Sequence, residues 1–118
     1  MIKLITSALQ PSLCRASEQH PKPLRVGLFQ MRWNSDPKAH VARLQEGVAT
    51  CAHAGAELVF LPELTLSRYP ADKRPQADKD RQPERLEDGP TIAFAQEAAR
   101  ANDVFVQVSL YEQADRDD

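Results

Sequence analysis

The sequence predicts an α/β fold in which three parallel strands alternate with two helices, in the order βαβαβ. Strands are expected at about 24–31, 58–61 and 104–110. The second and third of these stretches are nearly continuous in apolar side chains, which is typical of parallel strands buried on both faces. Two segments with helical periodicity separate them. Strands that alternate with helices in this way are joined by right-handed crossovers and pair in parallel.

The first helix is expected to begin after Asp36, its N-cap, and to continue to about Ala54. Pro37 takes the first helical position, where the missing N–H costs nothing, and Gly55 then ends the helix. Its apolar face carries side chains at helical spacing: Val41, Leu44, Val48 and Cys51. Cys51 is therefore predicted to be an inert core thiol, because burial in apolar surroundings disfavours the reactive thiolate.

A long segment, 64–88, separates the second strand from the second helix. It is rich in Pro, Asp, Lys and Arg, a composition that argues against a packed element, and loops of this length are usually functional or disordered. The motif Asp88-Gly89-Pro90 begins the second helix, which is expected to end near Ala101.

Glu63 is the first candidate for a functional residue. It follows the apolar strand Leu58–Leu61 and Pro62, which ends the strand. In open α/β sheets, ligands bind outside the carboxyl ends of the strands, so a carboxylate at this point is well placed for a site. The simpler interpretation, a solvated loop acid, stays open on this evidence alone.

A wider pattern resembles the opening of the carbon-nitrogen hydrolase (nitrilase) superfamily, from about Arg25 to about Glu112. Its parts occur in order: a strand with Gln30, a helix ending in Ala-His-Ala-Gly-Ala, a strand running into Pro-Glu-Leu, and then Tyr69-Pro70. The resemblance implies an α-β-β-α sandwich, of which this βαβαβ unit would be one part.

The resemblance also implies the chemistry. Members of the superfamily hydrolyse amides, carbamoyl compounds or nitriles through a Glu-Lys-Cys set, and Glu63 matches the general base. The lysine and nucleophilic cysteine lie further downstream in the family, so residues 24–118 are expected to be the amino-terminal part of the domain and inactive alone. The implied partners are a small-molecule substrate and, in the complete enzyme, further copies of the same chain in a homo-oligomer.

Tyr69 and Arg68 are the candidate substrate-binding residues. In the resembled family the loop after Pro-Glu-Leu lines the substrate pocket and often carries Gly-Tyr, whereas here Arg68 stands in place of the glycine. A side chain there disfavours positive φ, and a guanidinium is suited to a carboxylate on the substrate. The alternative is a surface Arg-Tyr pair.

Composition and charge narrow the class of protein. A net charge of −2 among 118 residues gives no basic footprint for nucleic acid, and no apolar run is long enough for a membrane span. Two cysteines in unlike settings suggest free thiols and a reducing, cytoplasmic location. His40 and His53 lack ligand spacing, so we expect no metal and no cofactor. Residues 1–23 are expected to be a disordered leader.

Two other functions remain open from the sequence. Glu112 also follows an apolar strand, so Glu63 and Glu112 would emerge at one edge of the sheet, and paired carboxylates are the equipment of glycoside hydrolysis. A chain that descends from a hydrolase can also serve as a non-enzymatic interaction fragment or pseudo-enzyme.

Overall fold

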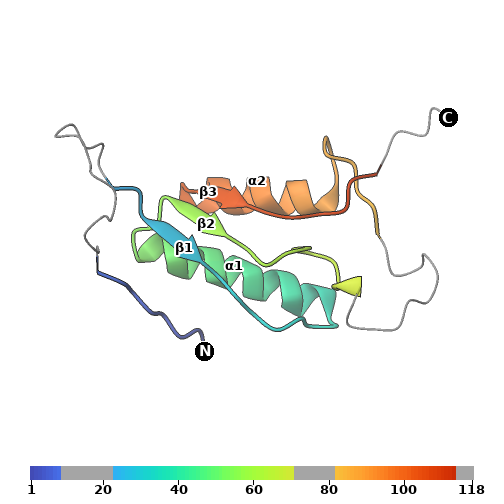
Figure 1. Ribbon diagram of the computed structural model, residues 1–118. Helices are drawn as coiled ribbons and strands as arrows, with labels where there is room; N and C mark the ends of the chain where they lie inside the picture. Colours follow the sequence, from blue (N-terminus) through green and yellow to red (C-terminus); the bar gives the residue numbers. More distant parts are fainter. Residues whose placement is uncertain (9–22, 71–81, 114–118) are drawn as a thin grey trace, which may run out of the picture.

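The computed structural model describes residues 1–8, 23–70 and 82–113. Its elements follow in the order β1 (Val26–Leu28), α1 (Pro37–His53), β2 (Leu58–Phe60), α2 (Pro90–Asn102) and β3 (Phe105–Gln107), as Figure 1 shows. The strands form one sheet in the order β1-β2-β3, and both pairs are parallel. The βαβαβ prediction is confirmed.

The strands are shorter than the apolar stretches that predicted them. Beyond the regular ladder, pairing continues as single bonds: the Phe29 N–H donates to the Phe60 carbonyl (2.9 Å) and the Leu61 N–H to the Gln107 carbonyl (3.2 Å). The chain leaves the sheet gradually and loses its regular pattern within a few residues. Apolar content alone therefore overestimated the strand lengths.

The first helix begins and ends where the sequence predicts. The Asp36 carboxylate accepts hydrogen bonds from the N–H groups of Lys38 (2.9 Å) and Ala39 (3.4 Å), which have no partner within the helix. Pro37 opens α1, and Gly55 follows its end with a φ of +88°, a conformation that few residues other than glycine adopt easily.

The second helix is capped by a residue that the sequence analysis placed in an unpacked loop. Glu84 is buried, and its carboxylate oxygens accept hydrogen bonds from the Thr91 N–H (2.7 Å) and the Thr91 hydroxyl (2.7 Å). The N-cap, Gly89, has no side chain to do this, and a Cβ there would lie 2.5 Å from the Arg85 carbonyl oxygen. Part of the 64–88 segment is thus packed, contrary to the prediction, because a helix N-terminus attracts a carboxylate. Residues 71–81 lie outside the described residues.

The core lies between the sheet and both helices. Leu44 and Val48 of α1 are fully buried against Val59 of β2, and Phe94 and Ala98 of α2 belong to the same cluster. Because side chains of the two helices meet in one cluster with one strand residue, both helices cover the same face of the sheet. Cys51 belongs to this cluster as well, which confirms its predicted core position.

The opposite face of the sheet is apolar and exposed. In the strand register Val26 pairs with Leu58, and Leu58 pairs in turn with Phe105. The exposed fractions on this face include 78% for Leu28 and 77% for Phe105. The prediction that the strands are buried on both faces is therefore wrong for the described residues, because helices cover only one face. The resemblance stated above would place a second sheet here.

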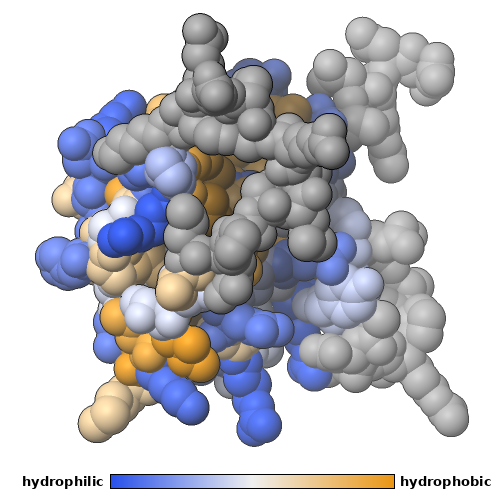
Figure 2. All heavy atoms as spheres, turned by 60° about the vertical axis from the view of Figure 1, so that its left-hand side comes forward, coloured by the Kyte–Doolittle hydropathy of each residue, from blue (hydrophilic) through white to orange (hydrophobic). Residues whose placement is uncertain are grey.

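Hydrophobic side chains also reach the surface in the view of Figure 2, where they gather in orange patches next to hydrophilic ones. Contiguous exposed apolar surface on a soluble domain commonly marks a place of association.

None of the helices in the described ranges is long and apolar enough to cross a lipid bilayer.

The exposed face predicts how the 118-residue chain behaves in isolation. We expect it to self-associate and to bind a hydrophobic dye, and Phe105→Lys should weaken both, because Phe105 is among the most exposed apolar side chains of the sheet. The free energy of unfolding should change by less than about 0.5 kcal/mol, as is usual for an exposed position. Sedimentation, dye fluorescence and a denaturant melt measure the three quantities.

Leu86→Lys is the matched control, because Leu86 is also an exposed apolar residue but lies between Glu84 and α2, outside the strands. It should leave association and dye binding nearly as they were. Equal effects of the two substitutions, or a monodisperse chain that ignores the dye, would count against an association face on the sheet.

Candidate active site

Glu63 lies where the chain leaves the central strand. It follows β2 after Leu61 and Pro62, at the carboxyl edge of the sheet, and its side chain is exposed. Leu61 still donates its N–H to Gln107, so the backbone is fixed to β3 until just before the carboxylate. The structure therefore places Glu63 at the strand end, where the sequence predicted it.

The residue after Glu63 has an unusual backbone. Leu64 has a φ of +51°, in the left-handed region, and its side chain is buried. For a residue with a Cβ this conformation costs roughly 1–2 kcal/mol, and such strain persists only where neighbouring contacts impose it. The left-handed residue turns the chain sharply directly after the carboxylate. Among described residues Asp103 is the other non-glycine residue with positive φ, so Arg68 does not adopt it.

Thr65 supplies the contacts that impose the turn. Its N–H donates to the Ser109 carbonyl (2.9 Å), and its hydroxyl oxygen accepts from the Ser109 N–H (3.1 Å). The same hydroxyl donates to the Pro62 carbonyl (3.0 Å). Thr65 is 2% exposed. Its hydroxyl oxygen thus accepts a backbone N–H, as the carbonyl of a neighbouring strand would, and links the turn to the chain beyond β3.

His40 holds the same turn from the side of α1. Its Nε2 lies 2.9 Å from the Thr65 carbonyl oxygen, and the Asn34 N–H points to its Nδ1 at 3.4 Å. A carbonyl only accepts, so Nε2 carries the hydrogen and Nδ1 accepts, which is the neutral imidazole. The ring is buried against Trp33, with 4.3 Å between ring centroids. His40 is a structural anchor in this arrangement.

Arg68 and Tyr69 lie in the wall of a small pocket beside this turn. The pocket has a volume of about 380 Å³, and Trp33, His40 and Glu84 also line it. Tyr69 is partly exposed. Glu63 is not among the residues that line this pocket, so the described residues bring the two candidate binding residues together without joining them to the carboxylate.

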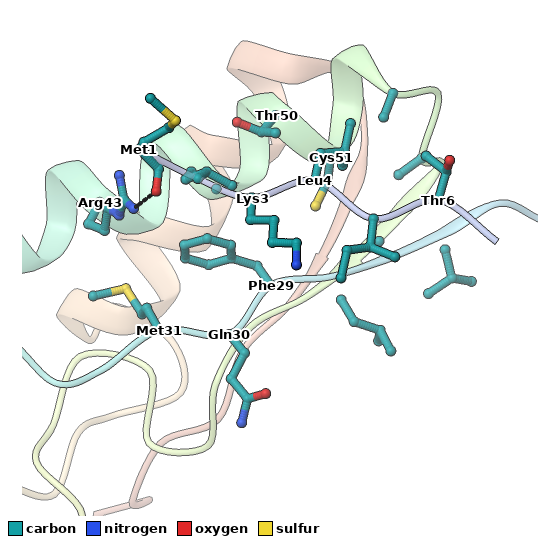
Figure 3. A pocket seen from close by; sticks show the side chains of 18 of the residues that line it. Met1, Lys3, Leu4, Thr6, Phe29, Gln30, Met31, Arg43, Thr50 and Cys51 are labelled. Atoms are coloured by element: carbon teal, nitrogen blue, oxygen red, sulfur yellow. Dashed lines mark hydrogen bonds between the residues drawn. The ribbon is translucent and has the colours of Figure 1, made fainter.

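A larger hollow lies elsewhere, between residues 1–8, β1 and α1, as Figure 3 shows. There the Arg43 guanidinium donates to the Met1 carbonyl (3.0 Å), and the side chain of Lys3 points toward Phe29. The hollow contains neither Glu63 nor the two candidate binding residues. Residues 1–8 belong to the predicted leader; residues 9–22 of it lie outside the described residues.

Cys51 is unsuited to partner Glu63. Its Cβ and Sγ pack so closely against Gly27 that a Cβ on that glycine would lie 2.7 Å from the Cβ of Cys51. Burial raises the pKa of the Cys51 thiol, which disfavours the nucleophilic thiolate. Cys51 lies in the last part of α1, whereas His40, near the start of the helix, contacts the turn that carries Glu63. Cys51 and this turn therefore lie toward opposite ends of α1.

The sequence analysis missed Thr65, His40 and Glu84 as residues that shape this region. One signal was available: Thr65 directly follows Pro-Glu-Leu, and a threonine near a strand end can hydrogen-bond to nearby backbone. Within the described ranges, no three His, Cys, Asp or Glu side chains gather closely enough to hold a metal ion.

The comparison with protein families agrees with the geometry. The family model described as carbon-nitrogen hydrolase matches residues 25–118. Because this match spans most of the chain, the protein belongs to the carbon-nitrogen hydrolase family. A comparison with curated proteins gives no match.

The buried position of Cys51 predicts low reactivity. In a Cys14→Ser background, a thiol reagent should modify native Cys51 far more slowly than the denatured chain, because both access and thiolate formation are suppressed. Cys51→Ala should cost about 1 kcal/mol of unfolding free energy, the scale for removing a small buried group. Native and denatured modification rates and a urea melt measure these effects; a fast reaction in the native state would refute the assignment.

Proposed function

We propose that this chain supplies the general base of a carbon-nitrogen hydrolase, and that Glu63 is that base. The single observation that carries the proposal is the position of Glu63: a carboxylate at the carboxyl edge of a parallel sheet, in a chain that belongs to the family. Ligand sites of open α/β sheets lie at this edge. The substrate class is a small amide, carbamoyl compound or nitrile.

The role of Glu63 follows from what such a reaction needs. A cysteine attacks the carbon atom of the carbon-nitrogen bond as its thiolate, so a nearby base must take the thiol proton. The carboxylate accepts that proton and later returns it to the leaving amine. The oxyanion of the tetrahedral intermediate needs separate donors, among them the lysine of the family's catalytic set.

The nucleophile and the lysine are expected from parts of the enzyme other than the described residues. Cys51 is buried, with a raised thiol pKa, and we therefore propose that a cysteine of the remaining domain completes the site. By itself, the 118-residue chain should release no ammonia above background from an amide, an N-carbamoyl compound or a nitrile.

Arg68 and Tyr69 are proposed to contact the substrate. Both line the pocket beside the turn that follows Glu63. A guanidinium binds a carboxylate through two parallel hydrogen bonds, and a tyrosine combines an apolar ring with a hydroxyl. A substrate that carries a carboxylate would use both.

The general-base role predicts the effect of Glu63→Gln in the intact enzyme that contains these residues. The amide keeps the size of the side chain but accepts no proton, so the rate of acylation should fall by at least ~10²-fold. Single-turnover kinetics with an amide, an N-carbamoyl compound and a nitrile measure this rate. A denaturant melt should show that the fold is intact.

Glu57→Gln is the matched control, because Glu57 is an exposed glutamate that precedes β2, whereas Glu63 follows it. It should leave the acylation rate nearly at the level of the unmodified enzyme. Glu112→Gln tests the alternative in which Glu63 and Glu112 form the carboxylate pair of a glycoside hydrolase. That alternative requires that the unmodified enzyme hydrolyses a sugar substrate and that Glu112→Gln loses most of this activity. A full acylation rate in Glu63→Gln would remove Glu63 from the mechanism.

A further inference from the structure

We propose that Thr65 and His40 are positioning residues for Glu63: together they hold the turn that fixes where the carboxylate lies. The inference rests on the proposed function, because it concerns how the same base is placed. Neither residue needs to touch the substrate. Each acts through the backbone between Pro62 and Thr65.

In the described part of the chain, the exposed carboxylate of Glu63 has no hydrogen-bond or ion-pair partner. Side-chain contacts therefore do not place it, and its position depends on its own backbone. Whatever fixes that backbone fixes the point and the direction from which the Glu63 side chain extends.

The two residues that flank Glu63 constrain its backbone. The Pro62 carbonyl accepts a hydrogen bond from the Thr65 hydroxyl at 3.0 Å, and Leu64 has the strained φ of +51°. The hydroxyl thus closes the turn across Glu63. Loss of that bond removes one of the contacts that oppose relaxation of the left-handed Leu64, and a change of φ at Leu64 would change the direction of the chain next to Glu63.

The turn is attached to two separate parts of the fold. Thr65 exchanges two hydrogen bonds with Ser109 of the chain beyond β3, at 2.9 and 3.1 Å. His40 of α1 donates to the Thr65 carbonyl at 2.9 Å. The turn is therefore attached to the sheet on one side and to a helix on the other.

His40 is itself held in place by its neighbours. Asn34 donates its N–H to the imidazole Nδ1 at 3.4 Å, and the Asn34 side chain accepts from the Asp36 N–H at 3.0 Å. Asp36 caps α1. His40 is 4% exposed, and its ring packs against that of Trp33 in a tilted arrangement, with an angle of 48° between the ring planes. His40 thus transmits the position of the helix N-terminus to the turn.

Thr65→Val in the intact enzyme tests the inference. Valine keeps the shape and the burial but removes the hydroxyl, so Ser109 and Pro62 each lose a partner. We expect kcat to fall by about 10- to 10²-fold, the scale for a misplaced catalytic group, with KM changed less than about twofold. The substrate is whichever amide, N-carbamoyl compound or nitrile the unmodified enzyme hydrolyses fastest. Thr65→Ser keeps the hydroxyl and should restore most of the loss in kcat.

Thr91→Val is the matched control. Thr91 is also a buried threonine, 1% exposed, and its hydroxyl also makes a buried hydrogen bond, to Glu84 at the start of α2. It should lower the thermal midpoint by an amount comparable to Thr65→Val while leaving kcat as it was. If both substitutions lower kcat equally, the role of Thr65 is general stability and the inference is wrong.

A second pair of variants, at His40, tests the inference independently if the Thr65→Val protein does not fold. His40→Phe removes both ring nitrogens, whereas the amide of His40→Gln offers an N–H close to the position of Nε2. The inference requires a lower kcat in His40→Phe and its recovery in His40→Gln; KM is not used as a criterion for this pair, because His40 also lines the pocket that contains Arg68 and Tyr69. Equal kcat in the two variants would overturn it.

Glu63→Gln distinguishes failure of the proposed function from failure of the positioning role. A full rate in Glu63→Gln overturns the proposed function and this inference with it. A large loss in Glu63→Gln, together with an undiminished kcat in folded Thr65→Val and His40→Phe, overturns only the positioning role.

Discussion

The hydrogen bonds of Thr65 hold the turn on which the candidate site depends. Leu64 opposes them with a left-handed φ of +51°, at a cost of roughly 1–2 kcal/mol. Thr65 makes two bonds to Ser109, one to Pro62 and one to His40, and each contributes about 0.5–1.5 kcal/mol net. Together they exceed the strain, so the chain keeps the turn and Glu63 stays at the strand end.

The helices impose a second constraint, because they cover only one face of the sheet. Val59 points into the helix-covered core and is fully buried, whereas its neighbour Phe60 lies on the other face and is 37% exposed. Burying one such side chain stabilises a fold by about 1.5–3 kcal/mol, and several remain exposed on this face. The described residues thus form a layer of sheet and helices in which one face of the sheet is apolar and exposed.

Local signals predicted the elements well, and long-range contacts escaped prediction. Asp36, Pro37 and Gly55 act on their immediate neighbours, so their residue types alone predicted the bounds of α1. Thr65 pairs with Ser109, 44 positions away, and His40 with Thr65, 25 positions away. No periodicity encodes such pairs. The strand lengths and the burial of both faces were overestimated for the same reason: apolar content reports a preference for burial, while neighbouring elements decide how much is buried.

The exposed sheet face and the exposed Glu63 are connected through β2. Phe60 ends the strand on the open face, and Glu63 follows three residues later, within about 10 Å of chain. A layer that covers Phe60 and Phe105 would also reach toward the carboxyl edge and exclude water there. Exclusion of water strengthens electrostatic interactions in a site. Burial of the apolar face and exclusion of water from Glu63, the proposed base, are therefore expected to occur in the same step.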